Sequence, residues 1–288
     1  MTYSLKAVSG YLGVPADTVR KWELRHAVVS PKRLANGYRV YTEEDLQRLL
    51  RFAESRREGL PAPQARRKAA AAPSMAAPAG EVKAAVSAVL RFDRRALSRL
   101  YRRHARRGGE AASFSRLWLP VLAEIGRQAH EEGGLWIAAE HFASAFLRES
   151  LLSSFKCSAK GRSRLVLAAP AGDRHELGML AAACALDERG VPCVYLGPDL
   201  PLESLCAALK RLRAGGLSLT LTARRPRAEV RALLRALRRD FPGLEIFVCG
   251  QESLRHANLI RESGARFLGT DLERGLAAVA AALGGKPR

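Results

Sequence analysis

The chain contains 288 residues, a length that suggests two domains or three small ones. Its composition, 48% hydrophobic and 26% charged, is that of an ordinary globular protein, and no apolar run is long enough for a membrane span. We see neither a signal peptide nor paired cysteines, so we expect a cytoplasmic protein without disulfides or a zinc site. The net charge of +20 is spread evenly along the chain. It suits an anionic partner such as nucleic acid, but an arginine-rich proteome would explain it equally well.

The first residues predict a helix–turn–helix. Apolar side chains at positions 5, 8 and 12 indicate a first helix, and Gly13 suits the tight turn after it. Pro15 then opens a second helix over residues 18–25. This second helix would place three cationic side chains in the major groove of DNA: Arg20, Lys21 and Arg25.

A basic β-hairpin is predicted next. Asn36-Gly37 precedes an alternating run, which is a strong signal for a two-residue hairpin turn. A basic hairpin beside a recognition helix is the shape of a winged helix, and its candidate DNA-contacting residues are Arg33, Arg39 and Tyr41. After the hairpin, residues 42–46 carry a threonine followed by acidic residues, a pattern that predicts the start of another helix.

Four motifs in this block stand at a characteristic spacing: Thr18-Val-Arg-Lys-Trp-Glu-Leu-Arg25, Pro31-x-Arg33, Gly37-Tyr-Arg-x-Tyr41 and Asp45-Leu46. Over residues 3–60 they resemble the winged-helix domain of MerR-type transcription regulators. The resemblance implies a double-stranded DNA operator as partner, with Arg20 and Lys21 at the major groove and Arg39 and Tyr41 on phosphates. A change of Arg39 to alanine would then remove the steep salt dependence of DNA binding.

Two aromatic residues of this block have an alternative role. Trp22 and Tyr38 could pack within the domain instead of contacting DNA, and for Trp22 packing is the favoured interpretation. The metal-sensing branch of the MerR family ligates its metal through cysteines. Because no cysteine precedes Cys157, metal sensing is disfavoured.

A break in the chain follows at Pro61. We expect a DNA-binding domain at residues 1–62, and an Ala/Pro-rich, semi-flexible linker at 63–81 that has little to bury. Amphipathic patterns then predict a bundle of four helices within 82–158, over roughly 82–90, 94–106, 114–131 and 137–155. MerR-type regulators often dimerise through a long helix after the first domain, so the break implies that self-association uses another surface.

The last part of the chain, residues 162–288, alternates short apolar runs with amphipathic stretches. The apolar runs lie at 165–169, 191–196, 217–221, 244–248 and 266–268. This alternation predicts a five-stranded parallel, doubly wound sheet of the Rossmann or flavodoxin-like type. Ligands of such sheets bind beyond the carboxyl ends of the strands, so the loops there are the candidate ligand site.

The loop after the first predicted strand contains a histidine. Asp173 can hold the ring nitrogen of His175 that a metal would not use, and Gly178 lets a flat ligand approach the next helix. Three motifs follow one another with 41 and 26 residues between them: Asp173-x-His175-x-x-Gly178, Thr220-Leu-Thr222 and Cys249-Gly250. Their spacing resembles the cobalamin-binding module, whose second and third motifs are Ser-x-Leu and Gly-Gly.

This resemblance implies a role for each motif. His175 would be the lower axial ligand of cobalt, with Asp173 as its orienting partner. A slot for the displaced dimethylbenzimidazole tail would be lined by Thr220, Thr222 and Gly250. The chain departs from the family's pattern at Cys249, whose side chain stands where the first glycine is expected and would narrow the slot.

The order of modules extends the resemblance to nearly the whole chain. A MerR-type domain, a helical bundle and a cobalamin module form the architecture of CarH/LitR-type light-responsive repressors. In that family the bundle covers the upper face of cobalamin with a Trp-x9-Glu-His motif. Glu140 and His141 match this motif, but the tryptophan is missing. Either His130 replaces it, or His130 is the histidine that normally follows it, with one residue inserted and Ala129 in the place of the tryptophan.

The resemblance also implies how such a protein works. The cofactor would be adenosylcobalamin, and His130 could bind cobalt once light has removed the adenosyl group. The protein would self-associate as a dimer or tetramer on DNA and fall apart in light. An alternative interpretation gives His130 and His141 a structural role, in which neighbouring acids such as Glu131 pair with them in the bundle.

Three other functions are open. Cobalamin modules also serve methyltransferases and mutases, but three modules already fill 288 residues and leave no room for a substrate barrel, so we do not expect an enzyme. A regulator that has lost cobalamin could use its last module to dock a protein antagonist, which Cys249 and the missing tryptophan favour. The same scaffold could also hold another chromophore, such as a linear tetrapyrrole (a bilin).

Overall fold

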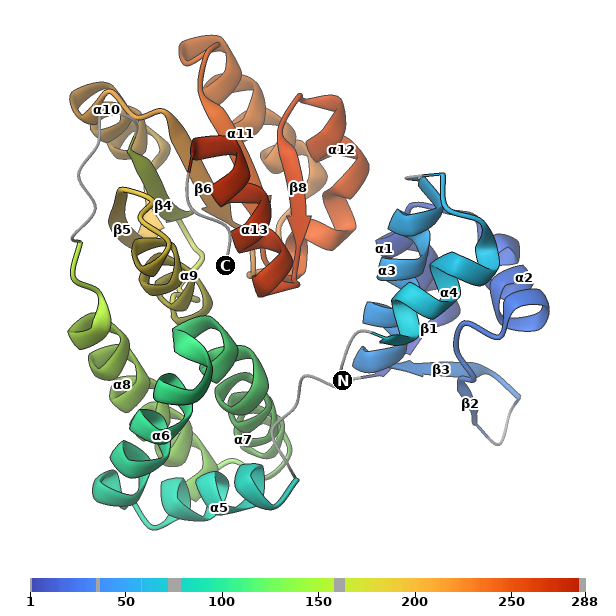
Figure 1. Ribbon diagram of the computed structural model, residues 1–288, viewed down its shortest axis with the longest axis horizontal. Helices are drawn as coiled ribbons and strands as arrows, with labels where there is room; N and C mark the ends of the chain where they lie inside the picture. The colour runs from blue at the N-terminus through green and yellow to red at the C-terminus, as the bar shows by residue number, and fades with distance from the viewer. Residues whose placement is uncertain (1, 35–36, 58, 72–78, 158–163, 285–288) are drawn as a thin grey trace. The chain divides into compact units, whose positions relative to one another are not determined.

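The computed structural model describes residues 2–34, 37–57, 59–71, 79–157 and 164–284. The chain divides into two compact units, the first made mainly of residues 1–74 and the second of most of the remaining chain. Figure 1 shows the first unit in blue and cyan and the second in green to red. None of the helices within the described ranges is long and apolar enough to cross a membrane.

The helix–turn–helix of the first unit forms where the sequence predicts it. Helix α1 (Leu5–Leu12) begins at Ser4, whose hydroxyl accepts the backbone N–H of Ala7. It ends at Gly13, which adopts the left-handed conformation with φ of 64° and turns the chain toward helix α2 (Ala16–His26). The tight turn therefore depends on a residue without a side chain.

The predicted wing is also present. It consists of three antiparallel strands in the order β1-β3-β2, with the bounds Thr2–Ser4 for β1, Lys32–Arg33 for β2 and Arg39–Thr42 for β3. The pairing of β2 with β3 confirms the hairpin, although Asn36 of its turn lies outside the described residues. Strand β1 is too short to leave a periodic signal, and the sequence did not predict it.

Helix α3 (Glu43–Arg57) starts with a capping box. The Thr42 hydroxyl accepts the N–H of Asp45 at 3.1 Å, and the Asp45 carboxylate accepts the N–H of Thr42 at 2.9 Å. This arrangement confirms the helix start that residues 42–46 predicted.

Part of the predicted linker is helical instead. Helix α4 (Ala62–Ala71) packs on α3 and buries Ala65 and Ala69, which lie one turn apart on the same face. Proline is tolerated in the first turn of a helix, so the prolines at 61 and 63 begin this helix rather than prevent it. The alanine-rich composition that indicated a linker thus supplies small side chains for close packing.

The second unit begins with the predicted helical bundle. Its elements are α5 (Ala79–Leu90), α6 (Arg94–Ser113), a π-helical turn (Phe114–Trp118), α7 (Leu119–Glu132) and α8 (Leu135–Ser154). Their apolar faces form one core, whose largest members include Tyr101, Trp118 and Phe146. Helix α6 runs further than predicted, because the positive φ of Gly109 (76°) kinks it without ending it.

A five-stranded parallel sheet follows, which confirms the predicted fold class. The strands are β4 (Leu165–Pro170), β5 (Cys193–Leu200), β6 (Gly216–Thr220), β7 (Glu245–Cys249) and β8 (Arg266–Gly269), in the order β5-β4-β6-β7-β8. This is the flavodoxin-like order, in which the chain reverses direction across the sheet between β4 and β6. The crevice at the carboxyl ends of these two strands is therefore the expected ligand site.

Helices cover both faces of this sheet (Figure 1). On one face, α9 (Leu177–Glu188) and α13 (Leu272–Leu283) share a core with β4. Two helices that contact each other, α10 (Leu202–Leu212) and α11 (Arg227–Asp240), lie on the other face. The short helix α12 (Ala257–Glu262) precedes β8.

Bundle and sheet share a packed boundary. Helices α6 and α8 both contact α9, and the Cys184 thiol of α9 lies 3.2 Å from the backbone oxygen of Leu151 in α8. The carboxylate of Glu176, just before α9, accepts hydrogen bonds from Arg148 of α8 at 2.8 Å and from the Tyr195 hydroxyl of β5 at 2.6 Å. This packing holds α8 against the loop that follows β4.

Candidate functional site

The loop after β4 presents His175 in a fixed orientation. Its ring nitrogen Nδ1 lies 3.0 Å from Oδ1 of Asp173, whose side chain is completely buried. The same oxygen accepts the backbone N–H of His175 at 3.2 Å. The imidazole itself is 65% exposed, so Nε2 faces outward from the carboxyl edge of the sheet. An imidazole whose Nδ1 is held and whose Nε2 is open is prepared to bind a metal centre.

Asp173 is anchored from the neighbouring strand. Its second oxygen, Oδ2, accepts the backbone N–H groups of Thr222 at 2.5 Å and of Ala223 at 2.9 Å, both in the loop after β6. The carboxylate therefore joins the two loops at the reversal point between β4 and β6. Thr222, which the sequence assigned to a tail slot, contributes its backbone to this anchor.

Charge and hydrogen bonding shift the pKa values of both Asp173 and His175. Burial alone would raise the pKa of Asp173, but its hydrogen bonds with His175, Thr222 and Ala223 lower it below the ordinary value. The hydrogen bond to Asp173 raises the pKa of His175, and the negative charges of Asp173 and of Glu140 in α8 add to this rise. The effect of Glu140 shows that the bundle contributes to the electrostatics of the histidine.

Buried hydroxyl groups lie along β6. Thr220 and Ser218 are both buried, and within the described residues their hydroxyls meet only the Cys249 sulfur, at 3.5 and 4.0 Å. Burial raises the pKa of the Cys249 thiol, so it stays neutral and offers only weak hydrogen bonds. These two hydroxyls therefore retain capacity for a stronger polar partner on the face of the sheet that they share.

The glycines of the predicted site differ in their surroundings. Gly250 has a φ of 93°, and a Cβ atom there would lie 2.4 Å from the backbone oxygen of Leu221. Glycine is thus required at this position by the close approach of two backbones, apart from any ligand. Gly178 is exposed at the start of α9, and among the described residues a Cβ atom there would meet Phe114 of the bundle at 3.8 Å.

The bundle residues that the sequence assigned to the site are all exposed. His130 on α7 and both Glu140 and His141 on α8 are exposed. In the part of the chain that the structure describes, neither histidine forms an ion pair, and Glu131 pairs with Arg127 instead. Trp136, which has the wrong spacing for the motif, donates its indole N–H to Glu132 at 3.0 Å.

Sequence reasoning missed three residues that connect the parts of this site. Glu176, Arg148 and Tyr195 join the histidine loop, α8 and β5, as described above. None of the three belongs to a motif. Only the position of Glu176 directly after His175 could have drawn attention to it.

The first unit presents a cationic face on α2. Lys21 and Arg25 are exposed on this helix beside Arg20, which forms a surface ion pair with Asp17 at 2.8 Å. Leu24 between them is 78% exposed. Arg33 is exposed at the wing, on strand β2. Together these residues form an exposed cationic surface on α2 and β2, the elements with which a winged helix contacts DNA.

Two wing residues do not lie where the resemblance placed them. Tyr41 is completely buried, and its hydroxyl donates a hydrogen bond to Glu23 of α2. Arg39 binds the other oxygen of the same carboxylate at 2.7 Å, and its side chain is only 18% exposed. Both residues therefore hold the wing on α2, and the assignment of Tyr41 to a phosphate is wrong for this structure. Trp22 packs edge-on against Phe52, in keeping with the packing role favoured for it.

This arrangement changes the expected result of replacing Arg39. Arg39→Ala would leave Glu23 with one hydrogen bond fewer in a mostly buried position, and we expect it to lower the stability of the first unit by about 1–3 kcal/mol. Lys21→Ala, on the exposed face, should leave stability unchanged and reduce the slope of log affinity for DNA against log salt by about one. Thermal unfolding and salt titrations of both variants test this; equal stabilities would contradict it.

The elements of the chain define a class of protein. A winged helix–turn–helix with a basic recognition helix, followed by a helical bundle and a flavodoxin-like sheet, is the architecture of a MerR-type transcription regulator. In agreement with this, residues 3–72 match the family model described as "MerR HTH family regulatory protein".

Two full-length relatives come from Myxococcus xanthus. The chain is 30% identical to the HTH-type transcriptional repressor CarH over 275 residues, which cover 88% of this chain and 91% of CarH. It is 27% identical to the HTH-type transcriptional repressor CarA over 273 residues, 93% of each chain. The protein therefore belongs to the CarH family of transcriptional repressors.

A solved structure shares the fold of much of this chain. The monomethylamine corrinoid protein of Methanosarcina barkeri superposes with a TM-score of 0.54 at 16% sequence identity. The match covers 71% of this chain and all of that protein.

Proposed function

We propose that this protein is a DNA-binding repressor whose assembly is controlled by cobalamin, with adenosylcobalamin as the light-sensitive form. The observation that carries the proposal is the outward-facing Nε2 of His175, whose opposite ring nitrogen is fixed by the buried carboxylate of Asp173. The relatives named above are repressors, and the proposal includes no catalytic activity.

The residues of this site fit such a cofactor. His175 would bind the metal through Nε2, with Asp173 fixing its tautomer. Thr220 and Ser218 would donate hydrogen bonds to the inserted tail, since only a weak thiol occupies them now. On the opposite side, the exposed His130, Glu140 and His141 would cover the upper face. Cobalamin supplies a cobalt ion that accepts an imidazole ligand and a cobalt–carbon bond that visible light can break.

The link between the site and the rest of the molecule runs through Glu176. This residue follows His175 directly and is held by Arg148 of α8 and by Tyr195 of β5. A ligand that shifts the histidine loop therefore acts on α8, and a ligand held by both sides favours one arrangement of bundle and sheet. We propose that this arrangement supports a dimer or tetramer, in which several weak DNA-binding units act together.

The test uses the full chain and free cofactor. The apo-protein is mixed with adenosylcobalamin in the dark, passed through gel filtration, and examined by absorption and elution volume before and after green light. We expect a retained red band and an earlier elution that reverts on illumination. A protein that remains colourless with adenosyl-, methyl- and hydroxocobalamin, yet still shifts DNA, would contradict the proposal.

A second function is favoured by two specific departures. Cys249 places a partly buried side chain beside Thr220, where a slot for the tail would pass, and no tryptophan stands ten positions before Glu140. A regulator that binds no cobalamin and docks a protein antagonist on its second unit would be consistent with both. The colourless outcome of the same experiment distinguishes this alternative.

A further inference from the structure

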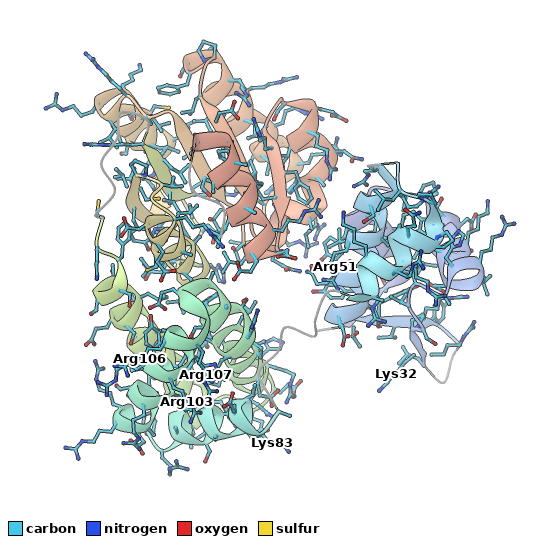
Figure 2. The ribbon with its side chains drawn as sticks, in the orientation of Figure 1. Lys32, Arg51, Lys83, Arg103, Arg106 and Arg107 are labelled. Carbon is cyan, nitrogen blue, oxygen red and sulfur yellow. The ribbon has the colours of Figure 1, made fainter. Side chains whose placement is uncertain are left out.

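A cationic surface on the bundle has no role in the function proposed so far. It consists of one lysine on α5 and five arginines on α6, and we call it the α6 basic face: Lys83, Arg99, Arg102, Arg103, Arg106 and Arg107. Figure 2 shows Arg103, Arg106 and Arg107 along α6 and Lys83 on the neighbouring α5. All six side chains are exposed.

Most of this charge is uncompensated. Glu81 of α5 pairs with Arg103 at 3.3 Å and contacts His104 at 3.0 Å. Burial lowers the pKa of His104, so this histidine is mainly neutral and adds little charge of its own. In the described residues, Lys83, Arg99, Arg106 and Arg107 have no ion pair with any acid.

The basic face is not needed for the fold of the bundle. Helix α6 turns Leu97 and Tyr101 into the core, and the exposed arginines lie on its opposite side. From residue 99 to residue 107 the helix rises by about 12 Å, and like charges at such spacing repel each other. Such a cluster presents a surface that suits an anionic partner.

We propose that the α6 basic face binds the phosphate backbone of the DNA that continues beyond the operator. The proposal rests on the DNA binding of the first unit. The basic face stands on the first two helices after that unit, and eight backbone steps separate Ala71 of α4 from Ala79 of α5. Such a segment spans at most about 28 Å, which is the length of about eight base-pair steps. A duplex bound by the first unit is therefore at high local concentration near the α6 basic face.

The chemistry of the face favours nucleic acid over a lipid surface. A helix that lies in a membrane interface needs an exposed apolar side, whereas the apolar side of α6 is buried in the bundle. Contacts from arginine and lysine to phosphates carry no sequence information. They would therefore add affinity to any operator that has flanking duplex, without changing which operator is chosen.

The test compares two charge-matched variants of the full chain. The first changes Arg99, Arg106 and Arg107 to glutamine. The control changes Arg227, Arg231 and Arg235 on α11 to glutamine, three exposed arginines that also have no ion pair in the described residues. The first probe is an operator selected from a random duplex pool. The second is the same operator with about 15 additional base pairs on each side, which is longer than the eight or so base pairs that the segment between α4 and α5 can span.

On the long duplex, the first variant should lose three phosphate contacts. Its slope of log affinity against log salt should therefore be less steep than that of the wild type by about 2.7. The ratio of wild-type to variant affinity for the long duplex should then increase by about 40-fold when the salt concentration is lowered from 200 to 50 mM. On the short duplex, and for the control variant on both duplexes, we expect wild-type slopes.

Three results would overturn the inference. Identical slopes for the wild type and the first variant on the long duplex would exclude phosphate contacts by the basic face, while DNA binding by the first unit would stand. A variant that loses binding to phosphatidylserine vesicles but keeps the wild-type DNA slope would identify a lipid surface as the partner. A wild-type protein that selects no duplex would remove the proposed function, and this inference with it.

Discussion

Changing His175 to alanine should abolish the light-dependent change in oligomeric state while leaving the protein folded. The imidazole is 65% exposed, so its removal creates no cavity, and Asp173 keeps three of its four hydrogen bonds. The loss of the fourth should cost about 1–3 kcal/mol and leave the second unit folded. The substitution does remove the one nitrogen that Asp173 orients toward a metal. Because the loss of a mere orienting partner weakens metal sites by about 10–100-fold, we expect the loss of the ligand itself to weaken retention of adenosylcobalamin at least as much. Gel filtration with absorption spectroscopy, in the dark and after illumination, provides both readouts.

Arg174→Ala is the matched control. Arg174 lies in the same loop, is 87% exposed, and meets Asp199 only at 3.8 Å. It should therefore retain the cofactor and dissociate in light as the wild type does. If the His175→Ala protein still binds adenosylcobalamin and dissociates in light, His175 is not the axial ligand, and the exposed His130 and His141 become the residues to replace.

The secondary structure was largely predictable because its signals are local. A glycine in the left-handed conformation, a capping box at residues 42–45 and short apolar runs each act within a few residues of the chain. The strands of the sheet are buried on both sides, so they appear in the sequence as continuous apolar runs. Helix α4 was not predicted, because its stability comes from the packing of Ala65 and Ala69 on α3. This packing leaves no local pattern in the sequence.

The candidate site was predictable only in part, and for a different reason. The motif around His175 correctly indicated Asp173 as its partner, since the two are only two positions apart in one loop. The role of Glu23 was not predictable, because its contacts with Arg39 and Tyr41 span 16 and 18 residues. The spacing of a motif identifies residues that lie near a surface. It does not show which cation already has a buried partner within the protein.

Changing Asp173 should have the largest effect on stability. Its carboxylate is fully buried and accepts hydrogen bonds from the Thr222 and Ala223 amides and from two N–H groups of His175. Alanine would leave the amides after β6 without an acceptor, at a cost of about 2–5 kcal/mol for the second unit. Calorimetry of the full chain should show the transition of the second unit move to lower temperature while that of the first unit stays.

Asparagine tests whether the negative charge matters beyond the shape of the side chain. All four hydrogen bonds at Asp173 come from donors, two on each oxygen, so an asparagine would have to turn its NH2 group toward two N–H groups. We therefore expect Asp173→Asn to destabilise the second unit nearly as much as Asp173→Ala. Asp271→Ala, which removes one exposed cap at the start of α13, should cost only about 1 kcal/mol. An asparagine variant as stable as the wild type would show that this carboxylate does not organise the two loops, and that the orientation of His175 has another origin.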